Sequence, residues 1–149
     1  MKHALRRFLP LVVLLIAGGA LATPFLKDVI WPPATDGIAW RTDYQAALAE
    51  AKATGKPLLL DFSASWCPPC KQMKQNAWPT PAVRDLANGG FIPVQLDVDR
   101  DDVRGVAQNF RVDSIPRIVV LSADGATILA NAQYLTPEGL AAFLKKQSR

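Results

Sequence analysis

Apolar positions follow two different periods along the chain from about residue 40 onward. They recur at helical spacing from a cap at Thr42 or Asp43 to Thr54. Leu58 to Phe62 is a continuous apolar run interrupted only by Asp61, which is typical of a central strand covered on both faces. The same signals predict further helices over Pro68 to Asn76, Thr80 to Ala87, Asp101 to Phe110 and Thr136 to Gln147, and further strands over Phe91 to Asp97, Arg117 to Leu121 and Thr127 to Ala130.

These elements predict an α/β fold with the order β-α-β-α-β-α-β-β-α. Parallel strands joined through helices are followed by an antiparallel hairpin, for which Asp124-Gly125 supplies the turn. Such a sheet is mixed, and its apolar strands need helices on both faces to cover them. We therefore expect one α/β domain with a mixed central sheet between two layers of helices.

The first residues of the chain have the pattern of an export segment. A basic start from Lys2 to Arg7 precedes an apolar stretch from Phe8 to Ala17, and Ala20-Leu21-Ala22 matches a small-residue cleavage site. An uncleaved anchor is the alternative to a signal peptide, because Phe8 to Leu26 carries no charge and is long enough to span a bilayer as a helix. Both readings place the rest of the chain outside the cytoplasm, in a periplasmic or equivalent compartment, secreted or held at the inner membrane by its N-terminus.

The chain accordingly divides into three predicted parts. Residues 1–22 are the signal peptide or membrane anchor, residues 23–39 are an extended linker with three prolines, and residues 40–149 are the folded domain. The formal net charge of +4 comes largely from the export segment, because the chain beyond residue 22 has 14 basic and 13 acidic side chains. Binding to nucleic acid requires a basic patch on the folded part, so we expect no nucleic-acid partner.

The candidate chemistry lies in the two cysteines of the sequence, Cys67 and Cys70, which flank two prolines after the first apolar strand. At a helix N-terminus the first sulfur lies near unpaired N–H groups, which favour the thiolate that attacks disulfides. The second sulfur, one turn later, can displace a partner from a mixed disulfide at Cys67. The spacing and its context therefore indicate dithiol–disulfide exchange.

Two other uses of the cysteine pair remain as alternatives. A structural zinc site needs two more ligands, yet the chain has no third cysteine and its one histidine, His3, lies in the export segment. We therefore expect no metal. A static disulfide that closes so short a loop would remove little entropy from the unfolded chain, so stability is a weak reason for it.

Asp61 is the most informative polar residue, because a carboxylate inside an apolar strand is costly unless it has a partner or a task. Burial is expected to raise its pKa into the range useful for general acid–base chemistry near neutrality. A structural carboxylate with satisfied hydrogen bonds is the alternative.

Several segments of this sequence resemble the thioredoxin family. LDFSASWCPPCK, from Leu60 to Lys71, resembles the active-site segment of thioredoxins. Ser114 to Arg117 resembles the loop that in this family holds a cis-proline against the active-site disulfide, and Asp124-Gly125 and Thr136 to Glu138 fall where the family has its hairpin and last helix. The resemblance covers about residues 40 to 147, and it implies a thioredoxin fold.

The resemblance also implies catalytic roles. Cys67 is expected to be the nucleophile, Cys70 the resolving thiol and Asp61 the group that relays a proton to or from the buried thiol. The chain departs from the family at Gln95, which stands where many thioredoxins have a lysine paired with this aspartate. A neutral amide favours the carboxylate less, so we expect Asp61 to titrate higher, with Lys71 offsetting part of the effect. No cofactor is expected beyond the redox-active cysteine pair itself.

Substrate binding is expected close to the cysteines. Trp66 is expected to lie beside the nucleophilic sulfur and to offer apolar contact to an extended peptide, with a core tryptophan as the alternative. Pro116, after Ile115, is expected to present backbone for β-type pairing with substrate, with an ordinary turn proline as the alternative. Pro68 and Pro69 shape the loop between the sulfurs, and Pro68 replaces the glycine common in cytosolic thioredoxins.

Two flanking motifs narrow the resemblance. Gly55 to Leu58 and Trp78 to Val83 are similar to the outward-facing thioredoxin-like domain of bacterial transmembrane disulfide reductases. The membrane helices of such a reductase are not in this sequence, so we expect a separate membrane electron donor. The expected function is a monomeric disulfide reductase of exported proteins. An envelope oxidase or isomerase, and a non-catalytic binding module or copper-delivery protein of the same fold, are the alternatives.

Overall fold

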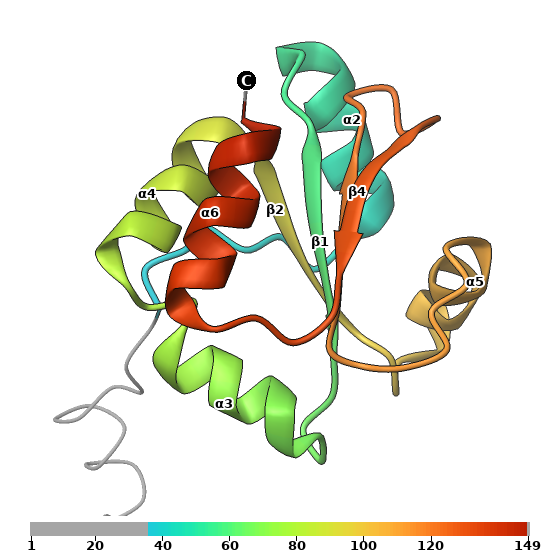
Figure 1. Ribbon diagram of the computed structural model, residues 1–149. Helices are drawn as coiled ribbons and strands as arrows, with labels where there is room; N and C mark the ends of the chain where they lie inside the picture. The colour runs from blue at the N-terminus through green and yellow to red at the C-terminus, as the bar shows by residue number, and fades with distance from the viewer. Residues whose placement is uncertain (1–35, 149) are drawn as a thin grey trace, which may run out of the picture. The chain divides into compact units, whose positions relative to one another are not determined.

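The computed structural model describes residues 36–148, which contain one four-stranded sheet (Figure 1). Its strands are β1 (Leu58–Ser63), β2 (Ile92–Asp97), β3 (Arg117–Leu121) and β4 (Ile128–Ala132). The strand order across the sheet is β2-β1-β3-β4. β1 pairs in parallel with β2 and antiparallel with β3, and β3 pairs antiparallel with β4. The predicted mixed sheet is therefore confirmed.

Helices cover both faces of this sheet. Leu58, Leu60 and Phe62 belong to a core on one face, together with residues of α2 (Tyr44–Thr54) and α5 (Asp101–Asn109). Leu59 belongs to the core on the other face, together with residues of α3 (Pro68–Asn76), α4 (Pro81–Gly90) and α6 (Pro137–Gln147), and Figure 1 shows α4 and α6 side by side. Because successive residues of a strand point to opposite faces, Asp61 shares the face of Leu59 and points to the side that α3 covers.

The start of the described chain differs from the predicted order of elements. The first strand of the predicted order β-α-β-α-β-α-β-β-α, which would precede α2, is reduced to a single bridge between Arg41 and Val94. Asp43 caps α2 two residues later, so the extended segment ends before it can form a longer strand. The predicted signal peptide or anchor and most of the predicted linker lie outside the described residues. Within residues 36–148, no helix combines the length and the apolar character needed to cross a membrane.

Side chains and prolines near the helix starts explain where the helices begin. Asp43, rather than Thr42, caps α2, because its carboxylate accepts two N–H groups of the first turn at 2.8 and 3.0 Å. Thr136 caps α6 through an N–H at 3.2 Å. Thr80 stands at the predicted cap position of α4, but its hydroxyl donates backward to the carbonyl of Ala77 at 2.8 Å. The proline that follows Thr80 therefore starts α4 without a side-chain cap.

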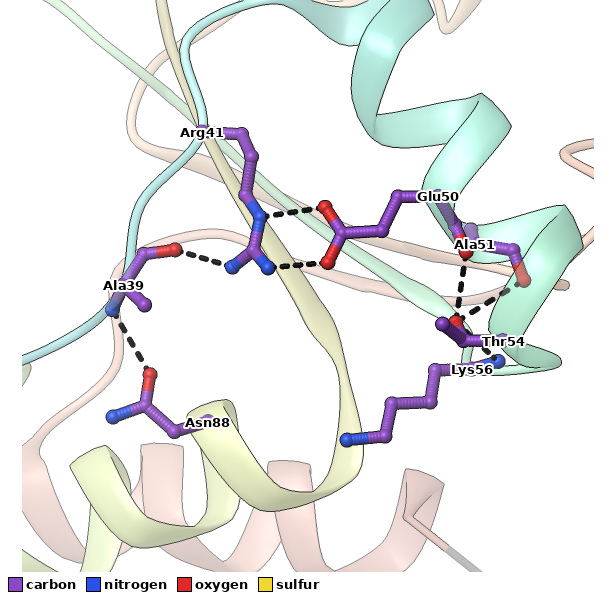
Figure 2. Close-up of polar contacts among 7 residues, drawn as sticks. All are labelled: Ala39, Arg41, Glu50, Ala51, Thr54, Lys56 and Asn88. Carbon is purple, nitrogen blue, oxygen red and sulfur yellow. Dashed lines mark hydrogen bonds and ion pairs between the residues drawn. The ribbon is translucent and has the colours of Figure 1, made fainter.

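The N-terminal strap, residues 36–41, is held against the domain by polar contacts (Figure 2). The Arg41 guanidinium donates two hydrogen bonds to Glu50 of α2, with Nε 2.9 Å from Oε2. The N–H of Ala39 donates to the side-chain oxygen of Asn88 in α4 at 2.9 Å. Together with the backbone bridge to β2, these contacts hold the N-terminal strap along the edge of the sheet.

Candidate active site

The two cysteines form a disulfide at the start of α3, with their Sγ atoms 2.04 Å apart. Cys67 is the N-cap residue, and Pro68 and Pro69 occupy the first turn, where a missing N–H costs no helical hydrogen bond. The N–H of Cys70 donates to the Sγ of Cys67 at 3.3 Å. When the disulfide is reduced, the same N–H and the helix N-terminus are placed to stabilise a thiolate at Cys67.

The loop before β3 packs against this disulfide. Cys67 and Cys70 are 2% and 6% exposed, and they form a small apolar cluster with Ala64. Ile115 is half-buried and packs against this cluster. The Ile115–Pro116 peptide bond is cis, as the resemblance to thioredoxins implies, and Pro116 is buried. The fold thus brings together the cysteine pair and the proline loop, which lie far apart in the sequence.

Trp66 lies on the surface next to the disulfide. Its side chain is 61% exposed, so the structure does not support the alternative of a core tryptophan. The indole Nε1 donates to Oδ2 of Asp99, in the loop after β2, at 2.8 Å. A groove of about 460 Å³ runs from Trp66 to Ile115 and is lined on its apolar side by Val98 and Ala107. The hydrogen bond to Asp99 holds the indole at one end of this groove.

The Ile115 loop is held in place by a polar chain of side chains. The Arg117 guanidinium, at the start of β3, lies 2.6 Å from the carboxylate of Asp113 and holds the pKa of that carboxyl below its usual value. The hydroxyl of Ser114 donates to the same carboxylate at 3.2 Å and accepts from the amide of Gln133 at 3.0 Å. Sequence analysis missed this anchoring, although an Asp and an Arg on either side of the proline are visible in the sequence.

Asp61 is 4% exposed and is the buried charged residue of the described core. In the sheet register it stands opposite Gln95 of β2 and Ile118 of β3. Burial raises the pKa of Asp61 to about 7, while the Gln95 side chain and the charge of Lys74 act in the opposite direction. The expectation that burial raises this pKa is therefore confirmed.

A cavity connects Asp61 with the disulfide. It has a volume of about 460 Å³ and is lined by Asp61, Cys70 and Gln95. Several of its lining side chains are polar, and the volume is enough for several water molecules hydrogen-bonded to them. Water in it would give a path for a proton between the carboxyl of Asp61 and the sulfur of Cys70.

The structure therefore places the predicted site residues around the disulfide. The two prolines between the cysteines lie at the surface. Pro68 is exposed and Pro69 is half-buried. Among the residues described, no three His, Cys, Asp or Glu side chains are grouped to hold a metal ion. The site is thus a buried cysteine pair with a carboxyl behind it and an apolar groove beside it.

The fold and the cysteine pair define a protein of the thioredoxin fold with a CXXC disulfide after its first strand. The family model described as Thioredoxin-like matches residues 39–123, so the chain belongs to the thioredoxin-like family. A thioredoxin H-type of Fagopyrum esculentum is 35% identical over 82 residues, which cover 55% of this chain and 62% of that protein.

Two further similar proteins are named as a thiol:disulfide interchange protein and as an oxidoreductase. The thiol:disulfide interchange protein DsbD of Vibrio cholerae is 33% identical over 93 residues, covering 61% of this chain and 15% of DsbD. The chain thus spans less than two thirds of these two curated relatives. The structure of a DsbH oxidoreductase superposes with a TM-score of 0.65 at 25% identity, covering 78% of this chain and 85% of DsbH.

The buried Asp61 gives a prediction for stability. Because folding raises its pKa above the unfolded value of 3.8, the stabilisation that comes from the protonated carboxyl is complete below about pH 4 and is lost as the pH rises through about 7. Asp61→Asn should therefore stabilise the disulfide form at pH 8, by up to about 4 kcal/mol, and change it little at pH 4. Denaturant unfolding at both pH values measures this, with the exposed Asp85→Asn as control. An equal effect at both pH values would contradict the assignment.

The contact between Trp66 and Asp99 gives a second prediction. Asp99→Ala should expose the Trp66 indole N–H to faster hydrogen exchange and change the free energy of unfolding by about 1 kcal/mol or less, because the bond is at the surface. Exchange of the indole proton can be followed by NMR, with Asp85→Ala as the matched control. Unchanged protection of the indole would show that Asp99 does not hold it.

Proposed function

We propose that this chain is a thiol:disulfide oxidoreductase that works through Cys67 and Cys70. The observation that carries the proposal is the disulfide at the N-terminus of α3, where Cys67 Sγ accepts the Cys70 N–H and Ile115 packs alongside. The thioredoxin and thiol:disulfide interchange names of its relatives agree with this activity.

In the proposed reaction the reduced protein gives two electrons to a substrate disulfide. The thiolate of Cys67 attacks one substrate sulfur, so a mixed disulfide forms, the substrate S–S bond breaks and the leaving sulfur takes up a proton. Cys70 then attacks Cys67 Sγ, and the mixed disulfide breaks. The substrate leaves as a dithiol, and the protein is left with the disulfide that the structure shows.

Asp61 is proposed to accept the proton of the Cys70 thiol when that thiol attacks. It lines the same cavity as Cys70, and burial places the pKa of Asp61 at about 7, where a carboxyl can both accept and return a proton. A surface carboxylate would be ionised throughout this pH range and would be a weak base. Burial of Asp61 thus matches its proton affinity to the step.

Substrate contact is proposed for the residues around the groove. Trp66 and Ile115 line it with apolar side chains, and Pro116 follows Ile115 in the loop that packs against the disulfide, where we expect its backbone to pair with substrate. Pro68 and Pro69 form the outer rim of the disulfide, since Pro68 is exposed and Pro69 half-buried. An extended peptide carrying the substrate disulfide fits this arrangement.

We infer that the protein works outside the cytoplasm as a reductant of exported proteins. The basic and apolar start of the sequence and the similarity to DsbD and DsbH support this location, with the N-terminus as signal peptide or anchor. A protein that gives electrons there needs a donor, which we propose to be a separate membrane protein. No cofactor is required beyond the cysteine pair.

The exchange reaction can be tested by trapping. Cys70→Ala should accumulate mixed disulfides at Cys67 because the resolving sulfur is missing, and Cys67→Ser should lose disulfide reduction by at least about a thousand-fold. Gel shift and mass spectrometry of captured proteins, together with reduction of a model protein disulfide, measure both effects. Gln72→Ala, exposed on the same helix, is the control. If Cys67→Ser reduced the model disulfide as fast as the wild type, the cysteine pair would not be catalytic, and the alternative of a non-catalytic binding module of this fold would remain.

The direction of electron flow can be tested by the reduction potential of the cysteine pair. A reductant should have a potential nearer the roughly −270 mV of thioredoxin than the roughly −120 mV of a strong envelope oxidant. Equilibration with glutathione or dithiothreitol buffers measures it. A potential near that of the strong oxidant would contradict the proposed reductase and favour an envelope oxidase.

A further inference from the structure

We propose that Lys74 is a positioning residue that supplies the positive charge acting on Asp61, for which β2 offers only the neutral amide of Gln95. The proposal rests on the proposed function, in which Asp61 takes the proton of Cys70. In this proposal α3 supplies the cation, because Gln95, which faces Asp61 in the sheet, carries no charge.

The sheet register places no positive charge directly opposite Asp61. Gln95 of β2 and Ile118 of β3 stand directly opposite it, and neither carries a charge. Because paired residues of adjacent strands point to the same face, Gln95 also points to the face that α3 covers. A positive charge for Asp61 must therefore come from outside the sheet.

Helix α3 brings Lys74 to the right place. Lys74 follows Cys70 by four residues, so the two side chains lie on the same face of the helix. Both line the cavity that Asp61 lines. Lys71 also reaches this cavity, but it follows Cys70 by one residue and so points about 100° away around the helix axis. The geometry therefore favours Lys74 over Lys71 as the cation that acts on Asp61.

The other charged groups near Asp61 do not replace Lys74. Asp36 of the N-terminal strap acts in the opposite direction, because its negative charge raises the pKa of Asp61. Asp97 at the end of β2 also lines the cavity but is negative, and Arg100 before α5 lines it with a guanidinium that is paired with Asp102 at 2.6 Å. The charge of Lys74 lowers the pKa of Asp61 against the larger effect of burial, which agrees with the geometry.

The consequence is that a larger fraction of Asp61 is ionised, and so able to accept a proton, at neutral pH. The thiol of Cys70 must lose its proton to attack Cys67, and that proton passes to a carboxylate oxygen of Asp61. A nearby ammonium favours the ionised carboxylate, so more molecules are ready for this step at a given pH. Without the ammonium, the same step would require a higher pH.

The direct test follows the Asp61 carboxyl by ¹³C NMR in the full-length disulfide form, where the cysteines do not titrate. Asp61→Asn assigns the signal. Lys74→Met should move the midpoint to higher pH, corresponding to a fall of about two- to five-fold in the acid dissociation constant. Lys74→Arg should stay close to wild type, because it keeps the charge. Lys71→Met, the matched control on the same helix, should shift the midpoint less than Lys74→Met.

Two results of this titration would overturn the proposal: an unmoved midpoint in Lys74→Met, or an equal or larger shift in Lys71→Met. Lys74→Arg separates a charge effect from a structural one, because a variant that keeps the charge should keep the midpoint. The titration needs no turnover. Full activity of Cys67→Ser in the trapping experiment would therefore reject the proposed function without deciding the role of Lys74.

Discussion

The site depends on one constraint, which is that Cys67 must be the N-cap residue of α3. The cap position places the first sulfur within reach of the Cys70 N–H and of the helix N-terminus, and the prolines that follow occupy the one turn where they cost no hydrogen bond. A helix that began one residue earlier or later would turn both sulfurs away from the Ile115 loop. The end of β1 and the start of α3 thus determine what the cysteines can contact.

Two long-range contacts complete what this local geometry begins. The loop before β3 supplies Ile115 against the disulfide, and the ion pair between Asp113 and Arg117 ties that loop to the start of its own strand. The loop after β2 supplies Asp99 to Trp66. The groove beside the disulfide therefore has walls from three separate segments of the chain, so its shape depends on the fold of the whole sheet.

Features with local causes could be predicted from the sequence. The environments of three features could be predicted from a few neighbouring residues: the apolar run of β1, the prolines of α3 and the isolated carboxylate of Asp61. The fold class could be predicted from the order of the elements. Contacts between residues that are distant in the sequence and are brought together by the fold could not be predicted. The bond from Trp66 to Asp99 was missed for this reason, and the sequence analysis named Lys71 but not Lys74 as a charge that offsets the loss of a lysine at position 95. Both lysines line the cavity of Asp61, and which of them lies on the same helix face as Cys70 depends on their positions around the axis of α3.

Asp61 shows why a buried carboxyl at this place is better explained by chemistry than by structure. An apolar residue in β1 would join the core that surrounds Leu59, whereas a carboxyl with a pKa of about 7 loses stabilisation as the pH rises through neutrality. A purely structural aspartate would be expected to have a cationic partner in the sheet, and the paired position holds Gln95 instead. The cavity that Asp61 shares with the Cys70 sulfur agrees with the proposed role of Asp61, because the same burial that destabilises the carboxylate would make it an effective base for a thiol.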